Sequence, residues 1–167
     1  LLRDGLDASN KNAQKEAFTA SGVGPLVELL KDRRGHVEAQ EYALWSLSLA
    51  IDETFFDVVT DKGGVKPLVT ALASRDRTTM EKATGALAKL ASAGDSARSL
   101  IAAAGGIEPL VALLDGMAAD GSELAQQDAA AALSELALLP ANKRTIDLAG
   151  GARRRPRRLA AAPHRSH

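Results

Sequence analysis

GGVKPLVTAL at residues 63–72 returns as GGIEPLVALL at residues 105–114, and SGVGPLVELL at residues 21–30 precedes both copies. The prolines of the three copies lie 42 residues apart, at Pro25, Pro67 and Pro109. Glycine adopts the left-handed conformation that ends many helices, and proline fits the first turn of the helix that follows. The stretch therefore predicts a recurring joint between two helices. Gly150-Gly151 is expected to begin a fourth copy.

Each repeat is predicted to contain three helices of unequal length. A short apolar helix follows the proline, and a longer amphipathic helix comes next, at about residues 37–51, 79–93 and 123–139. A brief third helix is expected near residues 12–20, 53–61, 95–104 and 142–149. The long helices carry an apolar stripe at helical spacing, formed by Val37, Leu44, Leu47, Ile51, Met80, Ala83, Leu87, Leu90, Ala129, Leu133 and Leu136. Because one repeat cannot bury this stripe alone, neighbouring repeats should stack into an all-α solenoid.

The first long helix can be aligned with the second in two registers. Alignment without a gap places Trp45 opposite Leu87, but it also puts Glu38 and Glu41 on the apolar stripe. A gap of one residue places Leu44 opposite Leu87 and keeps those carboxylates off the stripe. We adopt the gapped register for this reason.

The repeats divide the chain into six segments. Residues 1–10 are expected to be the remnant of a preceding repeat, residues 11–52, 53–94 and 95–140 to be three repeats, residues 141–151 to begin a further one, and residues 152–167 to form a basic, disordered tail. Apolar residues near both ends lack a neighbouring unit to cover them. We therefore expect further repeats on both sides in a longer parent protein.

The composition excludes several classes of chemistry. The 167 residues are 46% hydrophobic, 25% charged and 3% aromatic, and none is cysteine. A disulfide scaffold, a thiolate zinc site, an iron–sulfur cluster and a cysteine nucleophile are thus excluded. The three histidines are too scattered for a metal site, and neither a phosphate-binding glycine loop nor a serine nucleophile motif is present. We expect no enzyme activity, no metal and no cofactor.

The overall charge of zero conceals an asymmetry between the body of the chain and its end. All 21 acidic residues precede residue 152, and residues 1–151 carry a net charge of −6, whereas the last sixteen residues carry +6. Five arginines cluster in this tail: Arg153, Arg154, Arg155, Arg157 and Arg158. The tail has three interpretations: a nuclear-import signal or phosphate-binding arm, a segment that folds back on the acidic body, or a disordered end without a function.

The sequence shows no signal for a membrane. No apolar run approaches the roughly 20 residues that span a bilayer, and the N-terminus carries no targeting pattern. We therefore expect no membrane span and a location in the cytoplasm or the nucleus.

The period, the Gly-Gly-x-x-Pro joint and the Leu-x-x-Leu-Ala ending of the long helices at residues 87–91 and 133–137 resemble the armadillo repeat. The resemblance covers about residues 8–151. It implies a right-handed α–α superhelix of helix triplets. It also implies that the longest helices line a concave groove, which binds an extended peptide or a partner protein.

The resemblance also indicates candidate groove residues. Peptide-binding members of the family place an Asn near the end of the groove helix and a Trp one turn earlier. The Asn column falls here on Ser46, Lys89 and Glu135, and the Trp column on Tyr42, Gly85 and Ala131. No Asn is kept and only Tyr42 is aromatic, which does not favour a receptor for nuclear-localisation peptides.

One turn before the Trp column, the groove positions are Glu38, Glu81 and Gln127. Together with Glu135 they give three carboxylates against one ammonium group, that of Lys89, which favours a basic ligand. The alternative is that these residues only form solvated helix faces. Tyr42 and Trp45 either anchor a partner or fill the contact with the preceding repeat.

These observations predict a scaffold for protein–protein interaction. An extended peptide or partner protein would bind in its groove. The alternative is a nucleic-acid-binding or nuclear-transport accessory that acts through the arginine tail.

Overall fold

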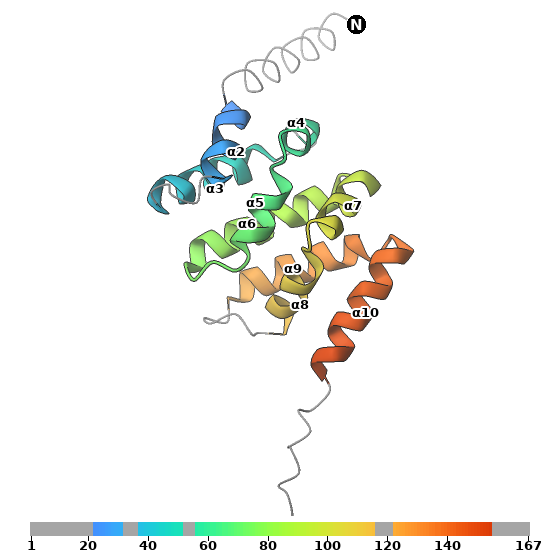
Figure 1. Ribbon diagram of the computed structural model, residues 1–167. Coiled ribbons are helices and arrows are strands. Elements are labelled where there is room, and N and C mark those ends of the chain that lie inside the picture. Colours follow the sequence, from blue (N-terminus) through green and yellow to red (C-terminus); the bar gives the residue numbers. More distant parts are fainter. Residues whose placement is uncertain (1–21, 32–36, 52–55, 116–121, 155–167) are drawn as a thin grey trace, which may run out of the picture.

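The computed structural model describes residues 22–31, 37–51, 56–115 and 122–154. Within these ranges the chain forms nine α-helices and no strand, which confirms the all-α expectation (Figure 1). The helices are α2 (Gly24–Lys31), α3 (Val37–Ala50), α4 (Phe56–Asp61), α5 (Val65–Ala71), α6 (Arg77–Ser92), α7 (Asp95–Ala103), α8 (Ile107–Leu114), α9 (Glu123–Leu136) and α10 (Pro140–Arg154).

Some of the sequence expectations lie outside the described residues. They are the remnant at residues 1–10, the helix near residues 12–20, and the tail arginines Arg155, Arg157 and Arg158. The side chains of Glu38, Arg153 and Arg154 also lie outside, although their backbone is helical.

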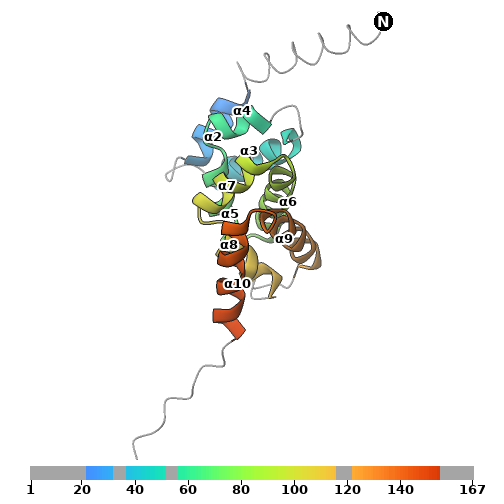
Figure 2. The same cartoon turned by 90° about the vertical axis from the view of Figure 1, so that its right-hand side faces the viewer.

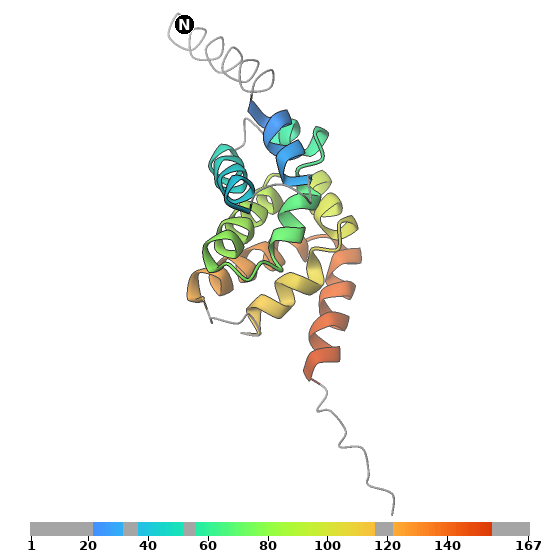
Figure 3. The same cartoon turned by 60° about the vertical axis from the view of Figure 1, so that its left-hand side comes forward.

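The helices stack in three columns, one for each helix of the repeat (Figure 3). The long helices α3, α6 and α9 lie side by side in one column, and α6 contacts both of the others. The short helices α2, α5 and α8 pack behind them, each against the long helix of its own repeat. The third column contains α4, α7 and α10, and α10 runs alongside α8 (Figure 2).

The predicted stripe forms the core between the columns. All of its members are buried except Val37, whose side chain lies outside the described residues. Leu44 is 1% exposed and Trp45 is 47% exposed, which confirms the gapped register. Burial of each large aliphatic side chain contributes roughly 1.5–3 kcal/mol, so the stripe is the main attraction between successive repeats.

The two glycines of each joint have different roles. The first ends one helix, and the second allows the next helix to pack closely. Gly105 adopts φ +78°, and Gly63 in the preceding joint adopts φ +76°. Gly106 has an ordinary φ of −76°, but a Cβ there would lie 2.8 Å from Ile101 Cγ2. The first glycine supplies the left-handed backbone, and the second supplies space.

Side-chain caps begin two of the long helices. The Asp76 carboxylate accepts a hydrogen bond from the Thr79 amide at 2.6 Å, and this bond holds the pKa of Asp76 below its ordinary value. Ser122 Oγ accepts from the Ala125 amide at 3.2 Å. The Asp76 cap places the start of α6 at Arg77, two residues before the expected position.

The prediction that Gly150-Gly151 forms a further joint is wrong. Helix α10 continues through both glycines to Arg154, where the other joints carry proline. The glycine pair permits a break, but proline and a following packed helix are needed to impose it.

None of the described helices is long and apolar enough by itself to cross a membrane. Among the described helices, one pair, α7 and α8, reaches that length and composition when taken together, and the two are bent by 88° relative to each other.

Candidate functional site

The long-helix column presents one outer surface, which we call the ladder face. It is formed by the outward side chains of α3, α6 and α9, and it contains the predicted positions Tyr42, Ser46, Glu81, Lys89, Gln127 and Glu135. Tyr42, Ser46, Lys89 and Gln127 are exposed, whereas Glu81 and Glu135 are partly covered. The structure thus brings these six residues onto three adjacent helices.

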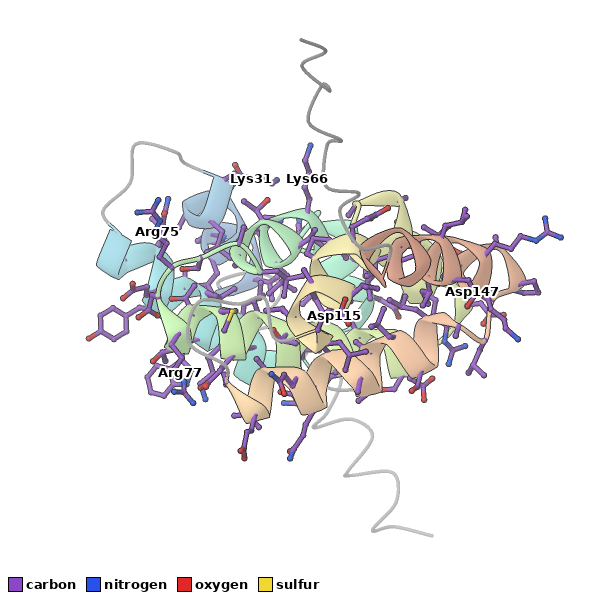
Figure 4. The ribbon with its side chains drawn as sticks, turned by 90° about the horizontal axis from the view of Figure 1, so that it is seen from below. Lys31, Lys66, Arg75, Arg77, Asp115 and Asp147 are labelled. Carbon is purple, nitrogen blue, oxygen red and sulfur yellow. The ribbon has the colours of Figure 1, made fainter. Side chains whose placement is uncertain are left out.

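Glu81 has its charge satisfied within the fold. Its Oε1 accepts a hydrogen bond from Arg77 Nε at 2.8 Å and another from the Ser122 hydroxyl at the start of α9. The bonds from Arg77 and Ser122 hold the pKa of Glu81 below its ordinary value. Figure 4 shows Arg77 at the end of the column where α9 begins. Glu81 therefore joins α6 to α9.

Glu135 is also paired internally. Arg98 Nη2 on α7 donates to Glu135 Oε2 at 2.7 Å, while its Nη1 donates to Asp95 Oδ1 at 2.7 Å. These two bonds raise the pKa of Arg98, whose side chain is only 12% exposed. The Arg98 carbonyl also accepts from Asn142 Nδ2 at 3.4 Å. Arg98 therefore ties α7 to α9 and α10, and it uses the carboxylate that was expected to face a ligand.

Asp128 on α9 is a ladder-face carboxylate that the family pattern did not identify. Its Oδ2 lies 2.9 Å from the position that a Cβ of Gly85 would occupy, so the missing side chain on α6 makes room for it. Burial raises the pKa of Asp128, while nearby Lys89 lowers it and Glu81 raises it further. Asp128 accepts no hydrogen bond from the described residues. A glycine in the middle of a helix was the available signal for this close approach.

Tyr42 and Trp45 stand at the first-repeat end of the ladder face. Tyr42 is 67% exposed and Trp45 is 47% exposed, so the described helices leave both rings largely uncovered. Trp45 borders a hollow of about 200 Å³ between α3 and α6, which is also lined by Glu41, Thr79 and Lys82. The two aromatic rings offer apolar surface to a partner beside a small, mixed-charge depression.

No set of three histidine, aspartate or glutamate side chains in the described ranges is arranged to hold a metal ion.

Comparison with known proteins identifies the repeat. The family model described as Armadillo/beta-catenin-like repeat matches residues 95–138. The search of proteins with curated function found no match.

Three solved structures illustrate the likeness. An engineered protein of the Northeast Structural Genomics Consortium is 34% identical with a TM-score of 0.72, over 84% of this chain and 56% of that one. Computationally designed armadillo repeat proteins for modular peptide recognition give 26% identity and a TM-score of 0.70, over 78% and 54% of the two chains. A designed armadillo repeat protein in complex with the peptide (KR)4 gives 26% and 0.71, over 83% and 57%.

The chain spans just over half the length of each of these three proteins. The repeat model, the three columns of helices and the structural likeness agree with one another. The described part of the chain has the fold of an armadillo-repeat solenoid, and residues 95–138 match the armadillo repeat.

Proposed function

We propose that the chain is a non-catalytic scaffold that binds an extended segment of a partner protein along the ladder face. The observation that carries this proposal is the exposure of Tyr42 and Trp45 on a helix whose other side is locked into the core. Large aromatic side chains are enriched among residues that dominate binding energy. On a rigid helix they lose little conformational freedom when a partner binds.

The charges of the ladder face refine the expected partner. Glu81 and Glu135 are paired with arginines, so we use Asp128, a ladder-face carboxylate without a hydrogen bond from the described residues, as the acidic contact. Lys89 lies near it and partly offsets its charge. We propose that the partner places one basic side chain at Asp128 and apolar groups at Tyr42 and Trp45. The (KR)4 complex supports the use of an armadillo surface for a basic peptide in a similar structure.

An array of immobilised twelve-residue peptides tests this function. The double variant Tyr42→Ala with Trp45→Ala should lose most peptides that the original chain captures, because it removes both anchors without touching the core. The matched control is Leu138→Ala with Leu148→Ala, which removes two exposed apolar side chains elsewhere. An unchanged capture pattern with the aromatic double variant would refute the assignment of the ladder face.

A second substitution tests the charge. Asp128→Lys should reduce the capture of peptides with one or two basic residues and leave neutral peptides unaffected. Circular dichroism should show unchanged helical content, because Asp128 makes no hydrogen bond that the fold requires. Equal capture of basic peptides by this variant would contradict the role of Asp128.

A further inference from the structure

The structure contains a cavity that the proposed ladder-face contacts do not use. It has a volume of about 690 Å³ and lies between the first two described repeats, where α2, α3, α5 and the start of α6 meet. Its apolar lining includes Leu30, Leu44, Pro67 and Ala71. Ligand pockets commonly have volumes of about 300–1,000 Å³, so the cavity can hold a bulky group.

A comparison of equivalent residues in two repeats explains part of this space. Ala71 lines the cavity, whereas the position 42 residues later carries Leu113, which is 4% exposed. The backbone of α5 therefore repeats that of α8, but its side chain is three carbon atoms smaller at this point. The same fold accepts leucine at the equivalent position, so the small residue at position 71 is not required by the repeat.

Cations stand along the open rim of the cavity. Lys66 lines it and makes no ion pair with a described residue. Lys31 Nζ lies 2.9 Å from Glu28 Oε1 and 3.4 Å from the Lys62 carbonyl oxygen. The Lys31–Glu28 pair is exposed and hence weak, so it leaves Lys31 available to another anion. Figure 4 shows Lys31, Lys66 and Arg75 along one edge of the molecule.

The opposite wall carries one acid, Glu41 on α3, and this wall leads to the ladder face. Glu41, Leu44 and Thr79 line both the cavity and the smaller hollow beside Trp45. The two depressions are therefore neighbours. A chain that passes Trp45 can reach the cavity with a single side chain.

We propose that the cavity is an anchor site for one large apolar side chain of the partner protein, and that an acidic residue next to it in the partner faces Lys66. The apolar walls favour removal of the side chain from water, and the Lys66 ammonium, which has no ion-pair partner among the described residues, is available to the neighbouring carboxylate. The proposal rests on the proposed scaffold function for its partner. The contacts proposed for the cavity do not depend on the contacts proposed for Tyr42 and Trp45.

Binding of a fluorescent apolar anion tests the cavity directly in the full chain. Anilinonaphthalene sulfonate should bind the original chain, and Ala71→Leu should weaken this binding at least tenfold because leucine fills the space. Lys66→Glu should weaken binding of this anion, while binding of the uncharged analogue phenylnaphthylamine should change less than twofold. Lys143→Glu, at an exposed position on α10, is the matched control and should change neither.

Peptides then test the nature of the occupant. An array that varies one Phe between flanking Asp, Ser or Lys residues should show a preference for Asp flanks. This preference should be lost with Ala71→Leu and reversed with Lys66→Glu. Dye binding without any flank preference would overturn the partner assignment. If a helical Ala71→Leu variant keeps both the dye binding and the flank preference, the assignment of the cavity as the anchor site is wrong. If Ala71→Leu does not fold, the exposed Lys66→Glu substitution decides the question alone, and an unchanged flank preference refutes the proposal.

The two proposals fail in different ways. If the ladder face is wrong and the cavity is right, the Tyr42 and Trp45 double variant keeps the Asp-flank preference that Ala71→Leu destroys. If the cavity is wrong and the ladder face is right, the double variant loses peptide capture and Ala71→Leu does not.

Discussion

Substitution of the two glycines in the α7–α8 joint should separate backbone conformation from space. Gly105 has φ +78°, and a Cβ there would meet nothing within 4 Å. Gly106 has φ −76°, but its Cβ would lie 2.8 Å from Ile101 Cγ2, 3.1 Å from the Ile101 carbonyl oxygen and 3.2 Å from Val69 Cγ2. The same substitution therefore meets conformational strain at the first glycine and steric overlap at the second.

The magnitudes follow from these two causes. Gly105→Ala should destabilise the fold by about 1–2 kcal/mol, the usual cost of a left-handed residue with a Cβ. Gly105→Asn should cost less than Gly105→Ala, since asparagine tolerates this conformation better. Gly106→Ala should cost about 1–3 kcal/mol because the Ile101 carbonyl is backbone and cannot move aside easily. Gly106→Asn should cost more than Gly106→Ala, because it adds further atoms to the same crowded place.

Urea unfolding followed by circular dichroism at 222 nm measures these differences, with the denaturant slope checked for equality among the variants. Asparagine should thus rank as the milder substitution at position 105 and as the harsher one at position 106. The reasoning is refuted if asparagine and alanine rank in the same order at both positions. The alanine variants also act as controls for the loss of glycine flexibility in the unfolded chain.

Two further predictions concern single side chains. The folded-state pKa of Asp128 is raised, so its contribution to stability is present at acidic pH and is lost as the pH rises through that pKa. The melting temperature of Asp128→Asn should therefore rise relative to that of the original chain as the pH increases from 3 to 7. The control Asp147→Asn, at an exposed position, should show no such rise. A difference in melting temperature between Asp128→Asn and the original chain that does not change with pH would contradict the burial of Asp128. Leu87 is fully buried in the stripe, and Leu87→Ala should lower the free energy of unfolding by roughly 2–5 kcal/mol in the same urea assay, while a loss near zero would exclude it from the core.

The sequence predicted the helix triplets well because their determinants are local and repeated. A left-handed glycine, a first-turn proline and a leucine stripe each act within one or two turns, so their spacing indicates where a helix ends and which side it buries. Even the one-residue gap in the first long helix followed from the stripe, as the burial of Leu44 and the exposure of Trp45 confirm.

The charge pairing could not be predicted in this way. Glu81 meets Ser122 across 41 residues, and Glu135 meets Arg98 across 37 residues. Helical periodicity places each carboxylate on a face, but it does not show which side chain of a neighbouring helix reaches it. Counting charges along the sequence therefore missed that Glu81 and Glu135 are paired within the fold, and it also missed Asp128, which accepts no hydrogen bond from the described residues.

The positions at which the repeats differ are more informative about binding than those at which they agree. Glycine, proline and leucine recur because every joint and every core layer needs them. At one ladder-face column, by contrast, the successive residues are Tyr42, Gly85 and Ala131: an exposed ring, a gap that receives Asp128, and a small exposed side chain. At the cavity, the repeats also differ in side-chain size, because Ala71 in α5 corresponds to Leu113 in α8. Gly85 is required by its close contact with Asp128, whereas the core requires neither the exposed ring of Tyr42 nor the small side chain of Ala71. Under the proposed function, positions 42 and 71 are therefore where a partner would distinguish one repeat from the next.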